Sequence, residues 1–466
     1  MATILSREQE LLCKQFQPII SRLLQKSLAS AGDLALTECA LECAVKEIRP
    51  LLVSSAVRTC VSSADRQFVC PDCSRELTHW GSTARTIVTS SGEGVFESER
   101  YRCRSCKSSH YPWQASQGLD GRNQLTLGAR ALIAEEAACA PFDLAAQRLN
   151  RMGLAVSASE VDRVAREVGT WRKQEQEVVR SVQTQGGSLR LPLQDWSEWP
   201  SDPSDNDIVV FSVDGAKVRS PEQGEQGSEW FEVRSGIVRY EQGNGTARKA
   251  CIGGVMDADQ LFETLRSQWW QSPSAWRQKG SRLRKVFIAD GADWIWDRAR
   301  WHFPDCIQIL DIYHAAEHVG SAARAAWGAD APKANTWVSR ATALLTARKG
   351  IQAILKQLVE VLRTDTAVNK QALATEMRYL WRHRHKMRYA QWRASGLPIG
   401  SGAMESTIKQ LSTQRLCLAG MMWTRKHADL MMHLRSAVLS DALRLTIGRE
   451  RVICLNRASK YYKQAI

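Results

Sequence analysis

The stretch IVVFSVDGAKV, residues 208–218, places an aspartate and a glycine directly after an apolar, β-branched run. Such a run predicts a buried strand, and Asp214 lies near its C-terminal side. KVFIADG, residues 285–291, repeats the pattern with Asp290 before a glycine. A carboxylate after a strand often only forms a turn or caps a helix. Since ligands collect at strand ends in α/β sheets, the repetition makes Asp214 and Asp290 candidate site residues.

The sequence around these two stretches predicts an α/β domain. Residues 231–243 and 247–257 alternate as two further strands, and helical periodicity follows over residues 258–270. A helix follows the second Asp-Gly pair, and residues 304–311 predict a short strand that ends at Asp311. The predicted order is strand, strand, strand, helix, strand, helix, strand.

A third carboxylate lies far along the chain, in IGSGAMESTIKQL, residues 399–411. Glu405 falls in the first turn of a predicted helix, where an acidic residue usually just complements the helix dipole. The flexible loop at residues 400–402 would let Glu405 come within a few ångströms of Asp214 and Asp290. Three carboxylates predict a two-metal site for Mg²⁺ or Mn²⁺, because Mg²⁺ prefers carboxylate, water and phosphate oxygens.

Two CxxC pairs, Cys70 with Cys73 and Cys103 with Cys106, flank a segment that alternates around a Gly-rich turn, as in a β-hairpin. Two such pairs joined by a hairpin predict a four-thiolate zinc ribbon, since tetrahedral Zn²⁺ needs four soft ligands. A redox role fits less well, because a thioredoxin-like CxxC lies in a βαβ context. Four thiolates leave no position for water, so we expect a structural site.

Helical patterns surround this ribbon. Residues 7–57 predict two amphipathic helices with a break at Gly32. After the ribbon, a helix over residues 143–152 ends at Gly153, and a second begins near Ala158 with a cap from one of two serines, Ser157 or Ser159. The pair fits a helix-turn-helix, or a plain three-helix scaffold.

The chain is basic, with a net charge of +14 and a pI of about 9.3. This balance suggests a polyanionic partner, with nucleic acid first, although a basic protein can merely be soluble. No apolar run is long enough for a membrane span, and the start lacks the layout of a signal peptide. We therefore expect a cytoplasmic, nucleoid-associated protein without a membrane partner.

A helical region over residues 322–388 ends in RYLWRHRHKMRYAQWR, residues 378–393, which mixes cations with aromatic residues. Cations contact phosphates and aromatic rings stack on bases, although a solvated basic helix face has the same composition. The candidate DNA-binding residues of the chain are Arg163, Arg166, Arg382, Arg384, Lys386, Lys409, Arg415, Trp423, Arg425 and Lys426.

Four of these segments, taken in order, resemble the DDE transposases of bacterial insertion sequences. They are SVDG at 212–215, ADGADWIWDRARWHFPDC at 289–306, DIYHAAEH at 311–318 and GSGAMES at 400–406. The likeness is to the ISKra group, with Mutator-like transposases more distant, and it extends from the zinc knuckles to about Ser440.

The resemblance implies an RNase H-like core in which Asp214, Asp290 and Glu405 hold the metal. The alternatives for the second carboxylate are Asp311, which also follows a strand, and Asp293 at a helix start. Related transposases carry a Cys/His-type feature after the second aspartate, and Cys306 and His314 lie near those places. By that resemblance Cys306 and His314 would orient DNA or a catalytic carboxylate. His314 and His318 share a helix face, and the alternative is simply a packed or solvent-facing histidine pair.

The implied fold is a multidomain α/β protein, with an RNase H-like mixed-sheet catalytic core interrupted by an all-helical insertion. The expected parts are a helical segment (1–62), a zinc ribbon (63–120), a helix-turn-helix DNA-binding domain (121–185), the core (206–320 and 395–445) and the insertion (321–394).

The implied activity is metal-dependent cleavage at the terminal inverted repeats of an element, followed by joining of the freed 3′-OH to target DNA. The partners would be double-stranded DNA, as transposon ends and target, and a second copy of the chain on the paired ends. Two other functions remain open. One is a zinc-ribbon DNA-binding regulator whose acidic residues are structural, and the other is a metal-dependent nuclease on the same core.

Overall fold

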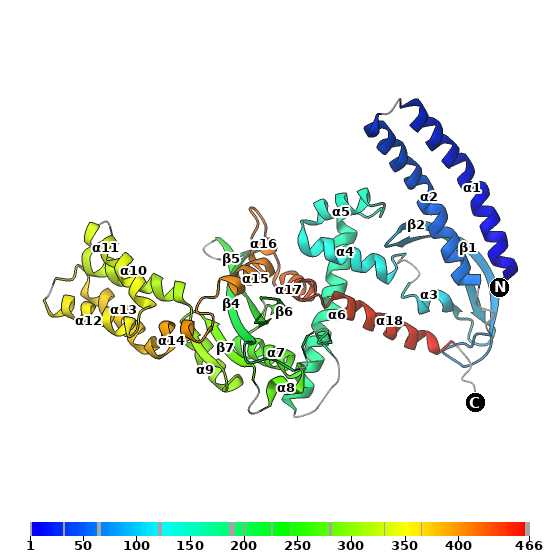
Figure 1. Cartoon of the computed structure of the whole chain (residues 1–466). Coiled ribbons are helices and arrows are strands. Elements are labelled where there is room, and N and C mark those ends of the chain that lie inside the picture. The colour runs from blue at the N-terminus through cyan, green and yellow to red at the C-terminus, as the bar shows by residue number, and fades with distance from the viewer. Residues whose placement is uncertain are drawn as a thin grey trace. The chain divides into compact units, whose positions relative to one another are not determined.

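The computed structural model (Figure 1) divides into two compact units, Met1–Trp171 with Leu443–Ile466 and Arg172–Ala442. No helix among the described residues is long and apolar enough to cross a membrane. The structure describes residues 2–30, 33–62, 67–119, 124–185, 192–197, 199–200, 202–224, 227–243, 245–278, 282–329, 331–364 and 366–461.

The first unit begins with the two predicted helices, α1 (Ala2–Ala29) and α2 (Leu34–Ser62), and the predicted break at Gly32 lies outside the described residues. The predicted hairpin is confirmed as β1 (Leu77–Thr89) and β2 (Gly92–Cys103), which pair antiparallel and are extended by the short β3 (Ser109–His110).

Glycine lets α2 lie close to β2. A Cβ on Gly94 would lie 2.6 Å from the side chain of Val53, and the N–H of Val95 donates to the Ser54 hydroxyl at 2.8 Å. A small core of Ile87, Phe96 and Leu119 closes this part of the unit.

The remaining helices of the first unit are α3 (Pro112–Ser116), α4 (Leu127–Cys139), α5 (Phe142–Arg151), the start of α6 (Ala158–Thr184) and α18 (Leu443–Ser459). The predicted turn between α5 and α6 is confirmed. Gly153 has a φ of +92°, and the Ser157 hydroxyl accepts from the N–H of Glu160 at 3.2 Å, which identifies Ser157 as the cap.

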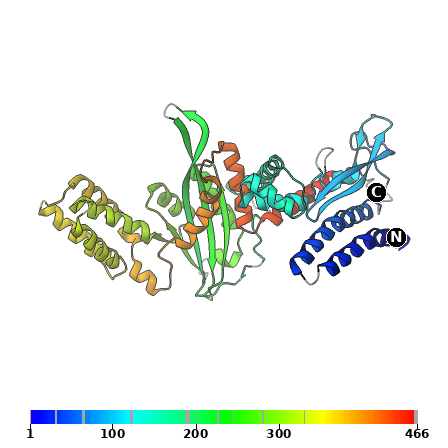
Figure 2. The ribbon, with the colours of Figure 1, turned by 90° about the horizontal axis from the view of Figure 1, so that it is seen from above.

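The second unit contains a five-stranded mixed sheet in the order β6-β5-β4-β7-β8, which confirms the predicted α/β class. The first three strands are antiparallel, while β7 runs parallel to β4 and β8 parallel to β7. Figure 2 shows β4 and β5 as a long ribbon. The strands are β4 (Ile208–Gly224), β5 (Gly227–Glu241), β6 (Ala247–Gly254), β7 (Arg284–Ala289) and β8 (Ile307–Leu310).

Helices cover both faces of this sheet. A Cβ on Gly236 would meet Leu265 of α7 (Ala258–Trp270), whereas one on Gly253 would meet Met432 of α17 (Arg425–Leu439). Because Gly236 pairs with Ile252, the neighbour of Gly253, the two glycines point to opposite faces. Lys173 in the C-terminal part of α6 bonds to Asp429 of α17 at 2.7 Å.

The predicted all-helical segment is confirmed and follows β8. The chain then returns to the sheet, and Glu405 lies on α15 (Gly402–Leu411). The remaining elements are α8 (Ser274–Arg277), α9 (Asp293–His302), α10 (Ile312–Trp327), α11 (Pro332–Leu345), α12 (Gly350–Arg363), α13 (Lys370–His383), η1 (Arg384–Lys386), α14 (Tyr389–Ala394), α15 (Gly402–Leu411) and α16 (Thr413–Leu416).

Candidate carboxylate and thiolate sites

Three carboxylates from distant parts of the sequence line one pocket of about 230 Å³ in the second unit. Asp214 lies in β4, Asp290 follows β7, and Glu405 lies in the first turn of α15. The parallel strands β4 and β7 pair as far as Phe211 and Phe287. Asp214 and Asp290 each lie three residues beyond that last pair, which places both at the same edge of the sheet.

The loop before α15 is fixed by hydrogen bonds, and these position Glu405. The Ser401 N–H donates to Asp311 Oδ2 at 2.7 Å, and the Ser401 hydroxyl also donates to this carboxylate. The N–H of Glu405 in turn donates to the Ser401 carbonyl at 2.6 Å. A Cβ on Gly400 would lie 3.1 Å from the Tyr313 ring, so a small residue lets the loop lie close to α10.

Negative charge accumulates in this pocket. The pKa of Asp214 is raised to about 6, chiefly by burial and also by the charges of Asp290 and Glu405, against the opposing hydrogen bond from the Gly215 N–H. Within the described residues, Lys409 is the only Lys or Arg paired with one of the three carboxylates, at 2.5 Å from Glu405. A cation bound in the pocket would offset this repulsion.

The structure brings the three carboxylates to one pocket, but not into a cluster as tight as that of the cysteines. In the described part of the chain they form no group whose oxygens all lie within 4.8 Å of one another, so joint binding of metal by the three stays a prediction. Two ions about 3.5–4 Å apart would in any case leave the outer ligands well separated.

Asp311 also lines the pocket, but hydrogen bonds engage both of its oxygens. Oδ1 accepts from the N–H groups of Tyr313 at 2.6 Å and His314 at 3.4 Å, which caps α10, and Oδ2 accepts from Ser401. This side chain is only 5% exposed. Asp290 Oδ1 accepts from the N–H of Ala292 at 3.0 Å, a turn contact that engages one of its two oxygens. The geometry therefore favours Asp290 over Asp311 as the second ligand.

The two histidines of α10 have different surroundings. His314 lines the pocket, with its Nδ1 3.4 Å from Glu317. His318 pairs with Glu376 of α13 at 2.6 Å and stacks on Tyr379, with ring centroids 3.6 Å apart. His314 can thus reach a molecule in the pocket, whereas His318 joins α10 to α13.

Tyr379 is a neighbour of the pocket that the sequence analysis missed. A Cβ on Gly291 would lie 1.5 Å from the Tyr379 hydroxyl, so the glycine after Asp290 makes room for this ring. Burial raises the pKa of Tyr379, as does the charge of Asp290. The only sequence signal was the glycine itself, which also fits a simple turn. Cys306 is half-buried, the pKa of its thiol is raised by burial, and it does not line the pocket.

The four cysteines of the two CxxC pairs form a cluster in the first unit, with all four sulfur atoms within 4.8 Å of one another. The Sγ atoms lie 3.4 Å apart for Cys73 and Cys103, 3.6 Å for Cys70 and Cys106, and 3.7 Å for Cys73 and Cys106. Zn–S bonds of about 2.3 Å in a tetrahedron place the sulfurs about 3.8 Å apart. The cluster can therefore bind zinc.

Two polar residues that the sequence analysis did not single out adjoin this cluster. His110 Nε2 lies 3.4 Å from Cys70 Sγ and 2.7 Å from the Ser108 hydroxyl. Hydrogen bonds from the hydroxyl and the N–H of Ser108 lower the pKa of Cys106 to about 6. Both residues follow the second CxxC directly, in the segment SSHY.

Three of the predicted DNA contacts are buried, with Lys386 4%, Arg415 1% and Trp423 7% exposed. Lys386 lies 4.7 Å from the centroid of the Trp296 ring, and Arg415 lies 5.0 Å from that of Trp423. The prediction that these three contact DNA is wrong for this fold, because their side chains pack inside it. A mixture of cations and aromatic residues does not distinguish such internal pairs from a surface.

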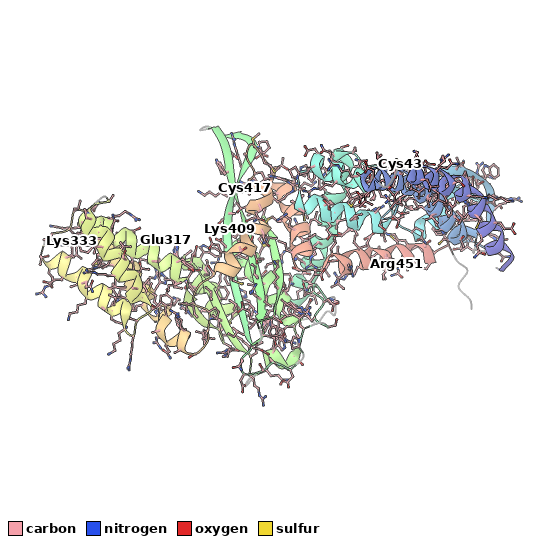
Figure 3. All side chains as sticks on the ribbon, turned by 45° about the horizontal axis from the view of Figure 1, so that its top comes forward. Cys43, Glu317, Lys333, Lys409, Cys417 and Arg451 are labelled. Carbon is pink, nitrogen blue, oxygen red and sulfur yellow. The ribbon has the colours of Figure 1, made fainter. Side chains whose placement is uncertain are left out.

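The other C-terminal candidates reach the surface, and they are Arg382, Arg384, Lys409, Arg425 and Lys426. Figure 3 labels Lys409 on α15. Arg382 pairs with Asp293 of α9 at 2.6 Å. Asp293 does not line the carboxylate pocket, which argues against it as the second ligand.

The candidates on α6 make ion pairs along their own helix. Arg163 lies 3.4 Å from both Glu160 and Glu167, and Arg166 lies 2.8 Å from Asp162. Their side chains remain about two-fifths exposed, and DNA contact by this helix stays a prediction.

Comparison with known proteins adds no assignment, since no family model and no curated protein sequence matches the chain.

Proposed function

We propose that the chain is a DDE transposase of the insertion-sequence type, which binds the terminal inverted repeats of an element and cuts and joins DNA. The observation that carries this proposal is the shared pocket of Asp214, Asp290 and Glu405, three carboxylates that are far apart in the sequence.

The sheet supports the proposal. Three antiparallel strands followed by two parallel ones, in the order β6-β5-β4-β7-β8, are the arrangement expected of an RNase H-like core. The first aspartate lies on the first strand, the second follows the fourth strand, and the glutamate lies on a helix after the all-helical segment. This is the order that the resemblance implies.

The pocket suits hard divalent cations such as Mg²⁺ or Mn²⁺. Its donors are carboxylate oxygens, and the raised pKa of Asp214 reflects burial and negative charge that a cation would offset. Asp214, Asp290 and Glu405 would hold the metal. When bound, two such ions supply charge stabilisation to the attacking and leaving oxygens of a phosphodiester.

The neighbouring residues have distinct parts in this proposal. Asp311 and Ser401 fix the loop that carries Glu405. His314, on the pocket wall, can hydrogen-bond a phosphate oxygen or move a proton. Lys409, which pairs with Glu405 and has a side chain that is 61% exposed, would offer a positive charge to DNA.

The first unit supplies the DNA-recognition elements of the proposal. Zinc held by the four cysteines would stabilise the hairpin, and α5 with α6 would form the helix-turn-helix that binds element ends. Two element ends must be processed together, so we propose a homodimer.

The test is a strand-transfer assay with labelled DNA that flanks the coding sequence in its source, in Mg²⁺ or Mn²⁺. We expect joined products with the wild-type chain. In D214N, D290N and E405Q we expect their rate of formation to fall by at least about 100-fold, because metal ligands are lost, while DNA binding is kept.

The same assay distinguishes the other functions. A zinc-ribbon regulator would give no products and would keep its activity in all three variants. A nuclease on the same core would yield cleaved but never joined strands. Either result would overturn the proposed transposase.

A further inference from the structure

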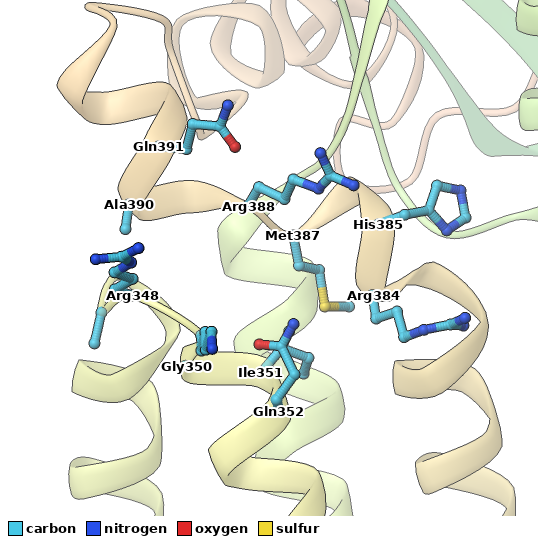
Figure 4. Close-up of a pocket in the computed structure, with 12 residues that line it drawn as sticks. Arg348, Gly350, Ile351, Gln352, Arg384, His385, Met387, Arg388, Ala390 and Gln391 are labelled. Atoms are coloured by element: carbon cyan, nitrogen blue, oxygen red, sulfur yellow. The ribbon is translucent and has the colours of Figure 1, made fainter.

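A second pocket, of about 680 Å³, lies within the helical segment of the second unit (Figure 4). One wall is the turn from α11 to α12, residues 347–352, and the other is formed by η1 and the start of α14, within residues 384–391. It shares no lining residue with the carboxylate pocket.

The lining of this pocket is basic and contains no acidic residue. Arg348 and Lys349 come from one wall, and Arg384 and Arg388 from the other. Arg348, Lys349 and Arg388 are exposed, and no carboxylate in the described part of the chain forms an ion pair with any of the four. Four unneutralised cations on facing walls create a local positive potential.

The start of α12 adds to this potential. Lys349 has a φ of +60°, and a Cβ on Gly350 would lie 1.7 Å from the Leu344 carbonyl, so the glycine permits a tight turn. Lys349 provides no side-chain cap, and Ile351 and Gln352 of the first helical turn line the pocket. The positive end of the helix dipole therefore lies beside the four cations.

The second wall is anchored to the sheet. The Tyr389 hydroxyl donates to the Leu310 carbonyl at 2.9 Å, directly before Asp311. From α14 the chain continues to the loop that carries Glu405. The basic pocket is thus held at a defined place relative to the carboxylate pocket within the same unit.

We propose that this basic pocket binds the sugar-phosphate backbone of the DNA on which the carboxylate pocket acts, an inference that rests on the proposed function. The cations are spread over two walls and exposed at the rim, which suits successive phosphates of a polymer. A small free anion would be better held by buried cations that converge on one point.

The test is fluorescence anisotropy with a 30-base-pair duplex and the full chain in a buffer without added Mg²⁺ or Mn²⁺, so that no strand is cut. We expect R348Q/K349Q/R388Q to reduce the slope of log K against log salt by about 2.7, since each of three phosphate contacts contributes about 0.9. At physiological salt we expect at least about tenfold weaker binding. Deuterium exchange of the wild type should show protection of residues 347–352 and 384–391 on DNA addition, which does not depend on how the variant folds.

The matched control is K333Q/R340Q/K356Q, which removes the same charge from exposed positions of α11 and α12 outside this pocket. Figure 3 labels Lys333. We expect this control to change the salt slope by less than about 0.5. Equal effects of the two triple variants, or an absence of protection, would overturn the proposal.

A separate arm adds pyrophosphate in place of DNA. If R348Q/K349Q/R388Q, the pocket variant, abolishes pyrophosphate binding but leaves DNA binding unchanged, the pocket is a small-anion site and the DNA assignment is overturned.

The D214N variant distinguishes a failure of this inference from a failure of the proposed function. If strand transfer does not need Asp214 but the pocket variant still loses DNA, the proposed function fails and the basic pocket stands.

Discussion

The thiolate cluster and the carboxylate pocket differ in how closely their ligands approach without a metal. Four sulfurs lie within 4.8 Å of one another, whereas the carboxylate oxygens of Asp214, Asp290 and Glu405 do not. Thiols can be neutral and hydrogen-bond to each other, but carboxylates at neutral pH carry charge and repel. The thiolate cluster is therefore built by two knuckles at the ends of one hairpin, whereas the three carboxylates come to one pocket from distant elements.

Replacing one of the four cysteines tests whether the thiolate cluster binds zinc. C103S should lose zinc and unfold the ribbon, because apparent zinc binding is worth about 10–16 kcal/mol in small zinc modules. We expect metal analysis to give one zinc per wild-type chain and far less in the variant. Fast deuterium exchange over residues 67–110 should accompany the loss.

The matched control is C39S, which changes an exposed cysteine outside the cluster. It should keep both zinc and slow exchange. A C103S protein with full zinc content and unchanged exchange would show that the four cysteines do not form a metal site.

A sharper comparison lies inside the carboxylate pocket, between Asp290 and Asp311. Asp311 positions Ser401 and so Glu405, and residues that orient metal ligands typically affect metal affinity by about 10–100-fold. We expect D311N to raise the Mn²⁺ concentration needed for half-maximal strand transfer by at least about tenfold. The rate at saturating Mn²⁺ should recover most of its wild-type value, unlike that of D290N.

The Ser401 hydroxyl provides the graded control. S401A removes one of the hydrogen bonds to Asp311 and keeps the backbone one, so its Mn²⁺ requirement should lie between those of the wild type and D311N. If saturating Mn²⁺ restored D290N and not D311N, then Asp311 would be the second ligand.

The sequence was sufficient to predict the elements that depend on local patterns. The strand with Asp214, the hairpin between the CxxC pairs and the cap at Ser157 each follow from residues close in sequence. Contacts between distant segments could not be predicted from such local patterns. Tyr379 beside Gly291 and Ser401 beside Asp311 join segments about 90 residues apart, and no pattern within either segment indicates the other.

The buried cations also could not be predicted from the sequence. Lys386 and Arg384 lie two residues apart in one basic run, yet Lys386 packs against Trp296 and Arg384 lines the basic pocket. Composition gives the charge of a segment but not which side chains face solvent. A shift of two residues around this short helix decides between a buried contact with Trp296 and a place in the lining of the basic pocket.

In the absence of metal, the charge of Asp214 is expected to lower the free energy of unfolding of the second unit slightly. Its pKa is raised from 3.8 to about 6 in the folded chain, so the folded state binds more protons than the unfolded state between these pH values. Stability from this group is therefore present below about pH 4, is lost as pH rises to about 6, and remains lost above it. Since Asp214 is partly exposed, we expect a cost of about 1–2 kcal/mol at pH 7.5.

D214N removes this cost because the amide carries no charge. In EDTA at pH 7.5 we expect calorimetry to give a melting temperature for the second unit a few degrees above that of the wild type, and the difference should vanish near pH 4. Added Mn²⁺ should stabilise the wild type more than the variant, by mass action on the folded state. A variant that is less stable than the wild type in EDTA at pH 7.5 would mean that Asp214 is a structural carboxylate, and the pocket would then lack its first metal ligand.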